Sequence, residues 1–268
     1  MEDNPRLALS ETITSRAPII TRARERMGAG SYGVWTATVF VPPPGASPDD
    51  LFAPRNVFDG FKTYCFVLRR RHIPAVGSLR TAAIFIDGAC SDNGSRYRSP
   101  RGGCAFVTNP GPGGTFGFPL EQEGPFGEPY PHTSNRAELR AAIAALEFHG
   151  FVFEGWERLV LITDSQYVSR HATHWLRVWS QRGWRTTSGQ PIKNRDLWEA
   201  LSEEMGWLAH LGCEVSFWMV PRRWNTVADA VAKAATRECG NEKFYELSWQ
   251  LVQCWETGSP MATPGHRD

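Results

Sequence analysis

The segment RLVLITDSQYV, residues 158–168, joins an apolar run to a carboxylate, a serine and a glutamine. The run through Thr163 predicts a buried β-strand, because nearly all of its residues are apolar. Two interpretations of Asp164 are then open. Either Asp164 or Ser165 caps a helix that follows the strand, or Asp164 lies at the strand's end and holds a metal ion.

Composition narrows the class of protein. The chain has 268 residues, enough for one large domain or one domain with extensions, and 41% of them are hydrophobic. A formal net charge of +1 excludes a globally basic nucleic-acid binder and leaves local basic patches open.

No two of the six cysteines have CxxC spacing, so we expect mostly buried thiols in a reducing compartment. No apolar run approaches the ~20 residues that span a bilayer, which predicts a soluble intracellular protein.

Strands and helices alternate on both sides of the opening segment. Strands are predicted at residues 82–87, 102–109, 111–118, 158–164 and 213–220, and helices at 134–150, 172–184, 194–212 and 226–239. Ser134 is the expected N-cap of the first helix. Weaker patterns at 31–41 and 63–68 are compatible with further strands. This order predicts an α/β domain with a mixed sheet, whose strand ends deliver carboxylates to the edge where such sheets bind ligands.

Four acids stand out by position: Asp87, Glu138, Asp164 and Asp229. Each has an ordinary explanation, respectively as a strand-end residue, a solvent-facing helix acid, a helix cap and a first-turn acid favoured by the helix dipole. If the four converge without lysine or arginine partners, they repel one another unless a divalent cation compensates them. Carboxylate oxygens favour Mg²⁺ or Mn²⁺ over zinc, and two such ions could activate a water against a phosphodiester.

From about residue 81 to 240 the chain resembles ribonuclease H of the bacterial and eukaryotic type. The matching text, in the family's order, is IDGAC with a following NG, TSNRAEL with AAIAALE, TDSQYV, RGW followed by PIKNRDLW, and N..AD. The ordered set is far more specific than any one of these short motifs. The resemblance implies a ribonuclease H fold, a five-stranded mixed sheet flanked by helices, in a eukaryotic member with a non-standard N-terminal extension.

The resemblance also implies an activity, namely endonucleolytic hydrolysis of the RNA strand of RNA–DNA hybrids. Two Mg²⁺ ions, with Mn²⁺ as an alternative, would be bound by the four acids, and the products would carry a 3′-hydroxyl and a 5′-phosphate. Ser165 is then the better candidate for the helix cap. Asn135 and Gln166 fall on family positions that contact the hybrid's minor groove, and side-chain amides can both donate to and accept from a 2′-hydroxyl.

Residues 166–196 combine six basic side chains and one acid with interleaved aromatic rings. This mixture suits a nucleic-acid groove, because phosphates attract cations and bases stack on rings. In the family, the RGW region is a basic protrusion that grips the DNA strand, so the resemblance points to Arg182, Trp184 and Arg185. We expect Trp175 and Trp198 to belong to the core.

The segment VPRRWNTVAD, residues 220–229, departs from the family pattern because its loop is shorter and has no histidine. Arg222 or Arg223 is expected to occupy that space and contact the scissile phosphate, with Asn225 as a further nucleic-acid contact. A general acid or base accelerates the catalysed reaction by about 10²–10⁴-fold, so losing it slows an enzyme without removing its metal chemistry. The alternative function is therefore a catalytically weakened, ribonuclease H-like nucleic-acid-binding protein.

The domain organisation follows from these boundaries. We expect an N-terminal extension of uncertain structure at 1–80, a ribonuclease H domain at 81–240 and a C-terminal tail at 241–268. The 51 residues between Asp87 and Glu138 exceed the family's spacing, which predicts an inserted surface loop within 110–131. The expected protein is a monomer of the nucleus or cytoplasm, with the mitochondrion left open, and it has no membrane partner.

Overall fold

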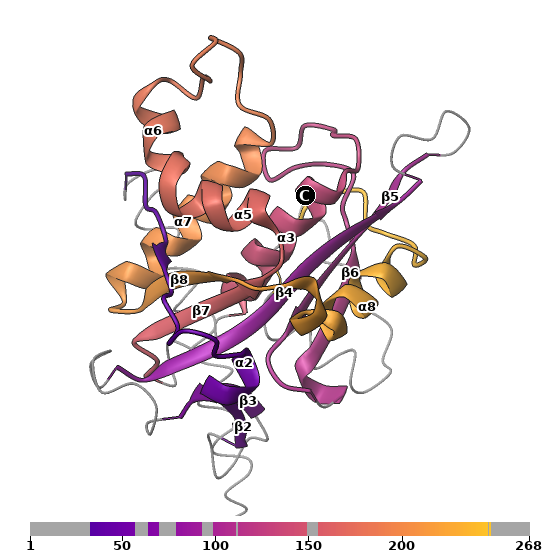
Figure 1. The fold of residues 1–268 in the computed structure, drawn as a ribbon. Coiled ribbons are helices and arrows are strands. Elements are labelled where there is room, and N and C mark those ends of the chain that lie inside the picture. Colours follow the sequence, from indigo (N-terminus) through magenta and orange to yellow (C-terminus); the bar gives the residue numbers. More distant parts are fainter. Residues whose placement is uncertain are drawn as a thin grey trace, which may run out of the picture. The chain divides into compact units, whose positions relative to one another are not determined.

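The computed structural model describes residues 33–56, 64–69, 79–92, 99–110, 112–148, 155–245 and 247. From Val34 onward these residues belong to one compact unit, shown as a ribbon in Figure 1. Much of the predicted N-terminal extension and nearly all of the predicted tail lie outside the described residues. The five described cysteines are free thiols, and three of them are buried. In the described part of the chain, no helix is long and apolar enough to cross a bilayer.

An eight-stranded mixed sheet lies at the centre of the fold. Its order is β1 (Thr38–Val39), β8 (Glu214–Met219), β7 (Arg158–Thr163), β4 (Thr81–Ser91), β3 (Tyr64–Leu68) and β2 (Phe52–Asn56), and β5 (Arg101–Val107) links β4 to β6 (Thr115–Pro119). The β1–β8, β7–β8 and β4–β7 pairs are parallel and the others antiparallel.

The predicted count of five strands is too low. Strands β4 to β8 are the five predicted ones, whereas β1, β2 and β3 come from the N-terminal segment. The segments of β1 and β3 are weak signals alone, and β2, with the sequence FAPRN, was not predicted; all three become strands by pairing with the larger sheet. The predicted boundary at residue 80 stays a prediction, although strands on both sides of it share one sheet.

Strand β4 is the longest strand and has three neighbours. Residues Thr81–Phe85 pair with β7 on one side, while Ala82 and Ala83 pair with β3 on the other. Beyond them, Phe85 to Ser91 pair with β5. Asp87 therefore lies in the middle of a continuous strand, just past the last residue that β7 pairs with.

Helices cover both faces of the sheet (Figure 1). On one face lie α3 (Ser134–Glu147), α5 (Gln166–Arg170), α6 (Leu176–Gln181) and α7 (Arg195–His210), and a π-helical turn, His171–Trp175, joins α5 to α6. The other face carries α8 (Thr226–Ala235), the short helix α2 (Pro48–Leu51) and the rings of Phe40, Phe52 and Trp218. The N-terminal segment thus supplies part of the hydrophobic cluster on this second face of the sheet.

Serine and threonine caps define where the helices begin. Thr133, and not the predicted Ser134, is the N-cap of α3, because its side chain accepts from the backbone N of Arg136 at 3.2 Å. The predicted cap at Ser165 is confirmed, since its hydroxyl accepts from the backbone N of Val168 at 3.1 Å. Ser165 therefore begins helix α5, and the preceding aspartate is not needed for capping.

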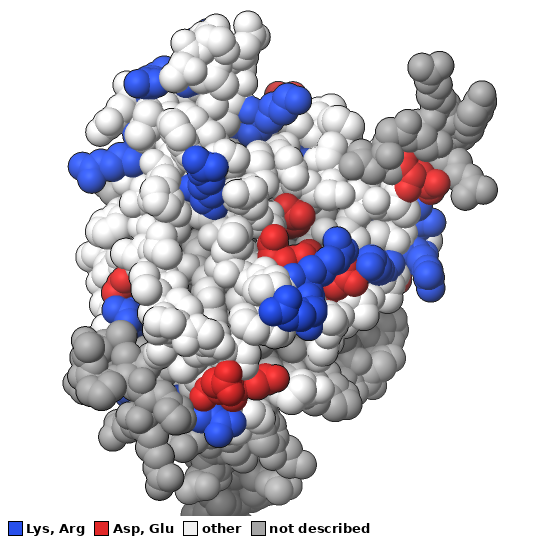
Figure 2. All heavy atoms as spheres, viewed as in Figure 1, with Lys and Arg blue, Asp and Glu red and all other residues white. Residues whose placement is uncertain are grey.

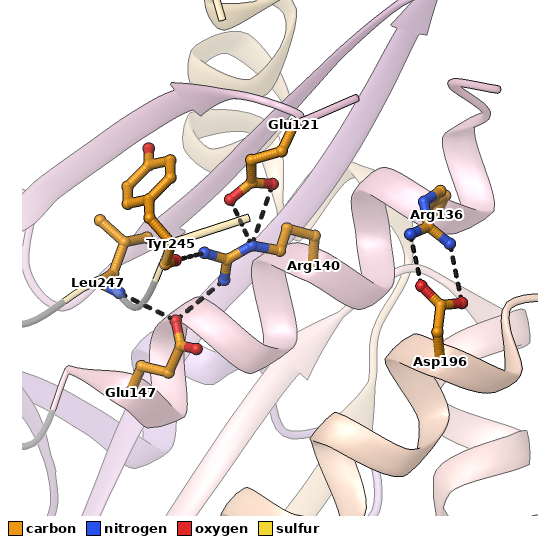
Figure 3. Close-up of polar contacts among 7 residues, drawn as sticks. All are labelled: Glu121, Arg136, Arg140, Glu147, Asp196, Tyr245 and Leu247. Atoms are coloured by element: carbon orange, nitrogen blue, oxygen red, sulfur yellow. Dashed lines mark hydrogen bonds and ion pairs between the residues drawn. The ribbon is translucent and has the colours of Figure 1, made fainter. Parts of the chain in front are cut away.

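Arg140 in the middle of α3 is a buried cation between two buried acids (Figure 3). It donates to Glu121 at 2.9 Å, to Glu147 at 3.0 Å and to the carbonyl oxygen of Tyr245 at 2.7 Å. Glu147 also accepts from the backbone N of Leu247 at 3.2 Å. The guanidinium and its acid partners thereby join α3 to Glu121 after β6, to Tyr245 and to Leu247.

Arg136 fixes the first turn of α3 in a similar way. Its guanidinium donates to both carboxylate oxygens of Asp196 on α7, at 3.0 and 2.5 Å, as drawn in Figure 3, and both side chains are buried. It also lies 3.9 Å from the centre of the Tyr130 ring. Two turns of α3 are thus anchored by directional contacts on either side of Glu138.

Replacing Arg140 with alanine is expected to lower the free energy of unfolding by about 3–5 kcal/mol, because it leaves two buried carboxylates without their cation. Denaturant unfolding at neutral pH measures the loss. Arg195→Ala is the matched control, since Arg195 makes an exposed pair with Glu199 and should cost only about 0.3–0.5 kcal/mol. Equal losses in the two variants would show that the buried network does not stabilise the fold.

Candidate active site

Asp87 and Asp164 occupy corresponding positions on adjacent strands. The parallel pairing of β4 with β7 runs up to Phe85 opposite Ile162, and each aspartate follows two residues later. Because side chains alternate along a strand, both carboxylates project from the face of the sheet that carries Phe85 and Ile162. The strand register therefore brings together two of the four predicted acids.

Asn225 fixes the position of Asp164. Its side-chain Nδ2 donates to Asp164 Oδ1 at 2.8 Å and to the carbonyl oxygen of Ile86 at 2.9 Å. Asn225 is only 1% exposed. The expectation that Asn225 contacts nucleic acid is therefore wrong for this arrangement, because its amide is buried and bridges the two acid-bearing strands.

Glu138 reaches the site because α3 lies directly on β4. Gly88 makes this possible, since a Cβ atom at this position would lie 2.1 Å from the backbone N of Glu138. The Glu138 carboxylate accepts from the hydroxyl of Ser165 at 2.5 Å. Ser165 thus caps α5 and also orients Glu138 beside Asp164.

Asp229 lies in the first turn of α8 and is compensated by two cations. Arg222 Nη2 donates to its Oδ1, and Lys233, one helical turn later, donates to its Oδ2 at 2.7 Å. The condition that the acids lack basic partners therefore does not hold at Asp229. Lys233 is not among the predicted site residues, although its i,i+4 spacing from Asp229 on a predicted helix indicates an ion pair.

The four carboxylates share one electrostatic site. Burial and the neighbouring charges of Asp164, Glu138 and Asp229 together raise the pKa of Asp87 to about 7, against the Gly88 N–H that lowers it. Burial likewise raises the pKa of Glu138 to about 7 despite the hydrogen bond from Ser165. Burial alone would raise the pKa of Asp229, but Lys233 and Arg222 bring it below its ordinary value.

The donor chemistry of Asp87, Glu138 and Asp164 fits a hard divalent cation, because all three present oxygen and neighbouring carboxylates help to raise the pKa of Asp87 and of Glu138. Across the described ranges, no three acidic, histidine or cysteine side chains yet converge closely enough to enclose an ion. A bound cation would therefore draw these carboxylates together. Figure 2 shows acidic side chains gathered near the middle of this face, with basic side chains beside them.

The two predicted minor-groove readers lie beside the acids. Asn135 is exposed in the first turn of α3, three residues before Glu138. Gln166 is exposed at the first residue of α5, two residues after Asp164. Both amides are therefore accessible to a ligand that reaches the carboxylates, and their role as contacts stays a prediction.

A cavity of about 220 Å³ lies between α6 and the loop that follows it. It is lined by His171, Trp175, Val178, Trp179, Arg182, Arg185, Thr186 and Thr187. Arg182 and Arg185 are exposed, as a phosphate contact requires. Trp175 was expected in the core, but it is 37% exposed and lines this cavity.

Trp184 and Trp198 both belong to the core. Trp184 is 9% exposed, with Arg195 lying 5.5 Å from its ring centre, so the expected grip of its ring on a DNA strand is wrong for this arrangement. It supports the loop that carries Arg185 instead. Trp198 is fully buried against Tyr167, which confirms its prediction as a core residue.

The chain is similar to known proteins over the part that carries the four acids. The model of the family described as RNase H matches residues 80–237. A protein named Ribonuclease H from Treponema pallidum is 42% identical over 136 residues, which cover 44% of this chain and 69% of the relative. Another of that name, from Halorhodospira halophila, is 47% identical over 124 residues, covering 44% and 68%. The solved structure of LC9-RNase H1 is 26% identical, with a TM-score of 0.41, over 59% of this chain and 72% of that one.

Gly88→Ala is expected to lower the free energy of unfolding by about 1–3 kcal/mol, because α3 must move away from β4 to admit the methyl group. Displacing Glu138 should also weaken the stabilisation by Mg²⁺ measured in thermal unfolding. Gly240→Ala is the milder comparison, since its Cβ would meet the Pro119 side chain at 3.1 Å instead of helix backbone at 2.1 Å. A Gly88→Ala protein that unfolds like Gly240→Ala would contradict the proposed close contact.

Removing divalent cations is expected to make stability pH-dependent. Asp87 and Glu138 have folded-state pKa values of about 7, above the ~4 of unfolded carboxyls, so they favour the folded state at low pH and lose this contribution as pH rises toward 7. In EDTA, wild-type protein should therefore lose stability between pH 5 and 8 relative to Asp87→Asn/Glu138→Gln. Mg²⁺ should stabilise wild type more at pH 8 than at pH 5.5. Parallel pH profiles for the two proteins would argue against these raised pKa values.

Proposed function

The chain belongs to the ribonuclease H family, and from this premise we propose that it is an endonuclease that hydrolyses the RNA strand of RNA–DNA hybrids. One observation carries the proposal. Asp87, Glu138, Asp164 and Asp229, drawn from β4, α3, the end of β7 and α8, act on one another electrostatically in one site. Such a concentration of acids is suited to divalent cations and to the phosphate they bind.

We propose that the four acids hold two divalent cations, Mg²⁺ first and Mn²⁺ as the alternative. When bound, the cations would supply an activated water and neutralise charge at the phosphate. The chain's own residues do the positioning. Ser165 orients Glu138 and Asn225 orients Asp164. Hydrogen bonds of this kind, made to a carboxylate that holds a cation, fix the direction of its oxygens.

Recognition of the hybrid is assigned to two separate surfaces. Asn135 and Gln166, exposed beside the acids, would read the 2′-hydroxyls of the RNA strand, because amides both donate and accept. Arg182 and Arg185, exposed around the cavity next to α6, would contact phosphates of the DNA strand. Trp175 offers a partly exposed ring at the same cavity.

A catalytically weakened hybrid-binding protein is the second candidate. The turn before α8 has no histidine, and Asp229 is already paired with Arg222 and Lys233. Both features would slow turnover while leaving hybrid binding in place. A nuclear or cytoplasmic location, a monomeric state, a eukaryotic origin and the boundaries at 80 and 240 remain predictions.

Purified protein is expected to cleave the RNA of a labelled RNA–DNA hybrid with Mg²⁺ or Mn²⁺ and to leave duplex RNA and duplex DNA intact. EDTA should stop cleavage. Asp164→Asn should lower the rate by at least about 10²-fold, because it removes a ligand and not merely an outer partner. Its hybrid affinity should change little.

Asp49→Asn is the matched control, because Asp49 is an exposed acid on α2, outside the site. It should cleave at the wild-type rate. Binding of hybrid by wild type without cleavage in either cation would favour the second candidate. An Asp164→Asn protein as active as Asp49→Asn would refute the assignment of the acids.

A further inference from the structure

The short turn between β8 and α8 places a guanidinium among the acids. Arg222, the first residue of the 3₁₀ turn Arg222–Trp224, pairs with Asp229 although its side chain is 68% exposed. Its charge also acts on Asp164 and Asp87, and it lowers the pKa of Glu138. Arg222 therefore interacts electrostatically with all four carboxylates.

The backbone of this turn is held by hydrogen bonds, whereas the side chain of Arg222 is mostly exposed. The backbone N of Trp224 donates to the Pro221 carbonyl at 2.8 Å, and the backbone N of Asn225 donates to the Arg222 carbonyl at 3.0 Å. The buried amide of Asn225 in turn holds the turn against β4. A long exposed side chain on such a base can change partners without any change in the fold.

Arg223 provides the comparison within the same turn. It has the same charge and is also exposed, but its guanidinium lies over the Trp224 ring, 5.1 Å from the ring centre. The two neighbouring arginines thus point to different partners. Of the two arginines, Arg222 pairs with an acid of the site, whereas Arg223 packs on Trp224.

Charge balance indicates what Arg222 does in the free protein. When all four carboxylates are ionised they carry four negative charges, and Arg222 and Lys233 place two positive charges beside Asp229. The remaining two negative charges equal the charge of one divalent cation. A second cation at Asp229 would have to compete with the guanidinium, and it would leave a positive site suited to a phosphate.

We propose that Arg222 is a mobile counter-charge, which pairs with Asp229 in the free protein and transfers to a phosphate oxygen when the hybrid binds. This rests on the proposed function. Guanidinium groups bind carboxylates and phosphates with the same forked geometry, so the exchange replaces one ion pair with another of the same kind. Lys233 lies on the same helix as Asp229 and stays with it. Transfer of Arg222 frees one oxygen of Asp229 for a cation.

The first test measures cation binding without nucleic acid. Calorimetric titration of the full chain with Mn²⁺ should give about two- to fivefold tighter binding for Arg222→Ala than for wild type, since an exposed ion pair no longer competes. Arg223→Ala should bind Mn²⁺ with the wild-type affinity. Equal affinities in all three proteins would overturn the proposal.

The second test is a double-mutant cycle on hybrid affinity in EDTA, where no cleavage occurs. Asp229→Asn should tighten hybrid binding several-fold, because it releases Arg222 and removes one negative charge. Most of this gain should vanish in the Arg222→Ala background and persist in the Arg223→Ala background. The same gain in all three backgrounds would show that Arg222 is a static partner of Asp229.

The two proposals fail in different ways. If wild type cleaves hybrid but neither the titration nor the cycle distinguishes Arg222 from Arg223, the counter-charge is refuted and the proposed function stands. If wild type neither binds nor cleaves hybrid, both are refuted.

Discussion

The contact between helix α3 and Gly88 of strand β4 determines the geometry of the site. Without a side chain at Gly88, the helix backbone approaches the strand closely enough for Glu138 to face Asp87 in the middle of β4 and Asp164 just after β7. Buried pairs of Arg136 and Arg140 hold the same helix on its other sides. Helix α3 is therefore positioned by steric contact on one side and by ion pairs on the others.

This packing concentrates negative charge where the fold offers little to neutralise it. Asp87 and Glu138 are disfavoured as anions by burial and by neighbouring carboxylates. Asp229 differs, because Arg222 and Lys233 compensate it. The site thus has a half on β4 and α3 whose carboxyl pKa values are raised and a half on α8 that two direct ion pairs neutralise.

Much of the fold could be predicted from the sequence, because apolar runs and caps are local signals. The strand ending at Thr163, the cap at Ser165 and the four acids on separate elements all follow from such signals. Tertiary choices could not be predicted in this way. Periodicity does not reveal that Trp184 is buried and Trp175 exposed, or that Arg222 rather than Arg223 faces Asp229. The role of Gly88 depends on a helix 50 residues away.

The central claim is that the uncompensated acids form a cation site. Crystals of the full chain grown with Mn²⁺ would test it most directly through anomalous scattering at the manganese edge. The account predicts a peak bonded to carboxylate oxygens of Asp87, Glu138 and Asp164, with the three side chains drawn closer together than in the free protein. Well-ordered carboxylates without a peak between them, at saturating Mn²⁺ and pH 8, would contradict it.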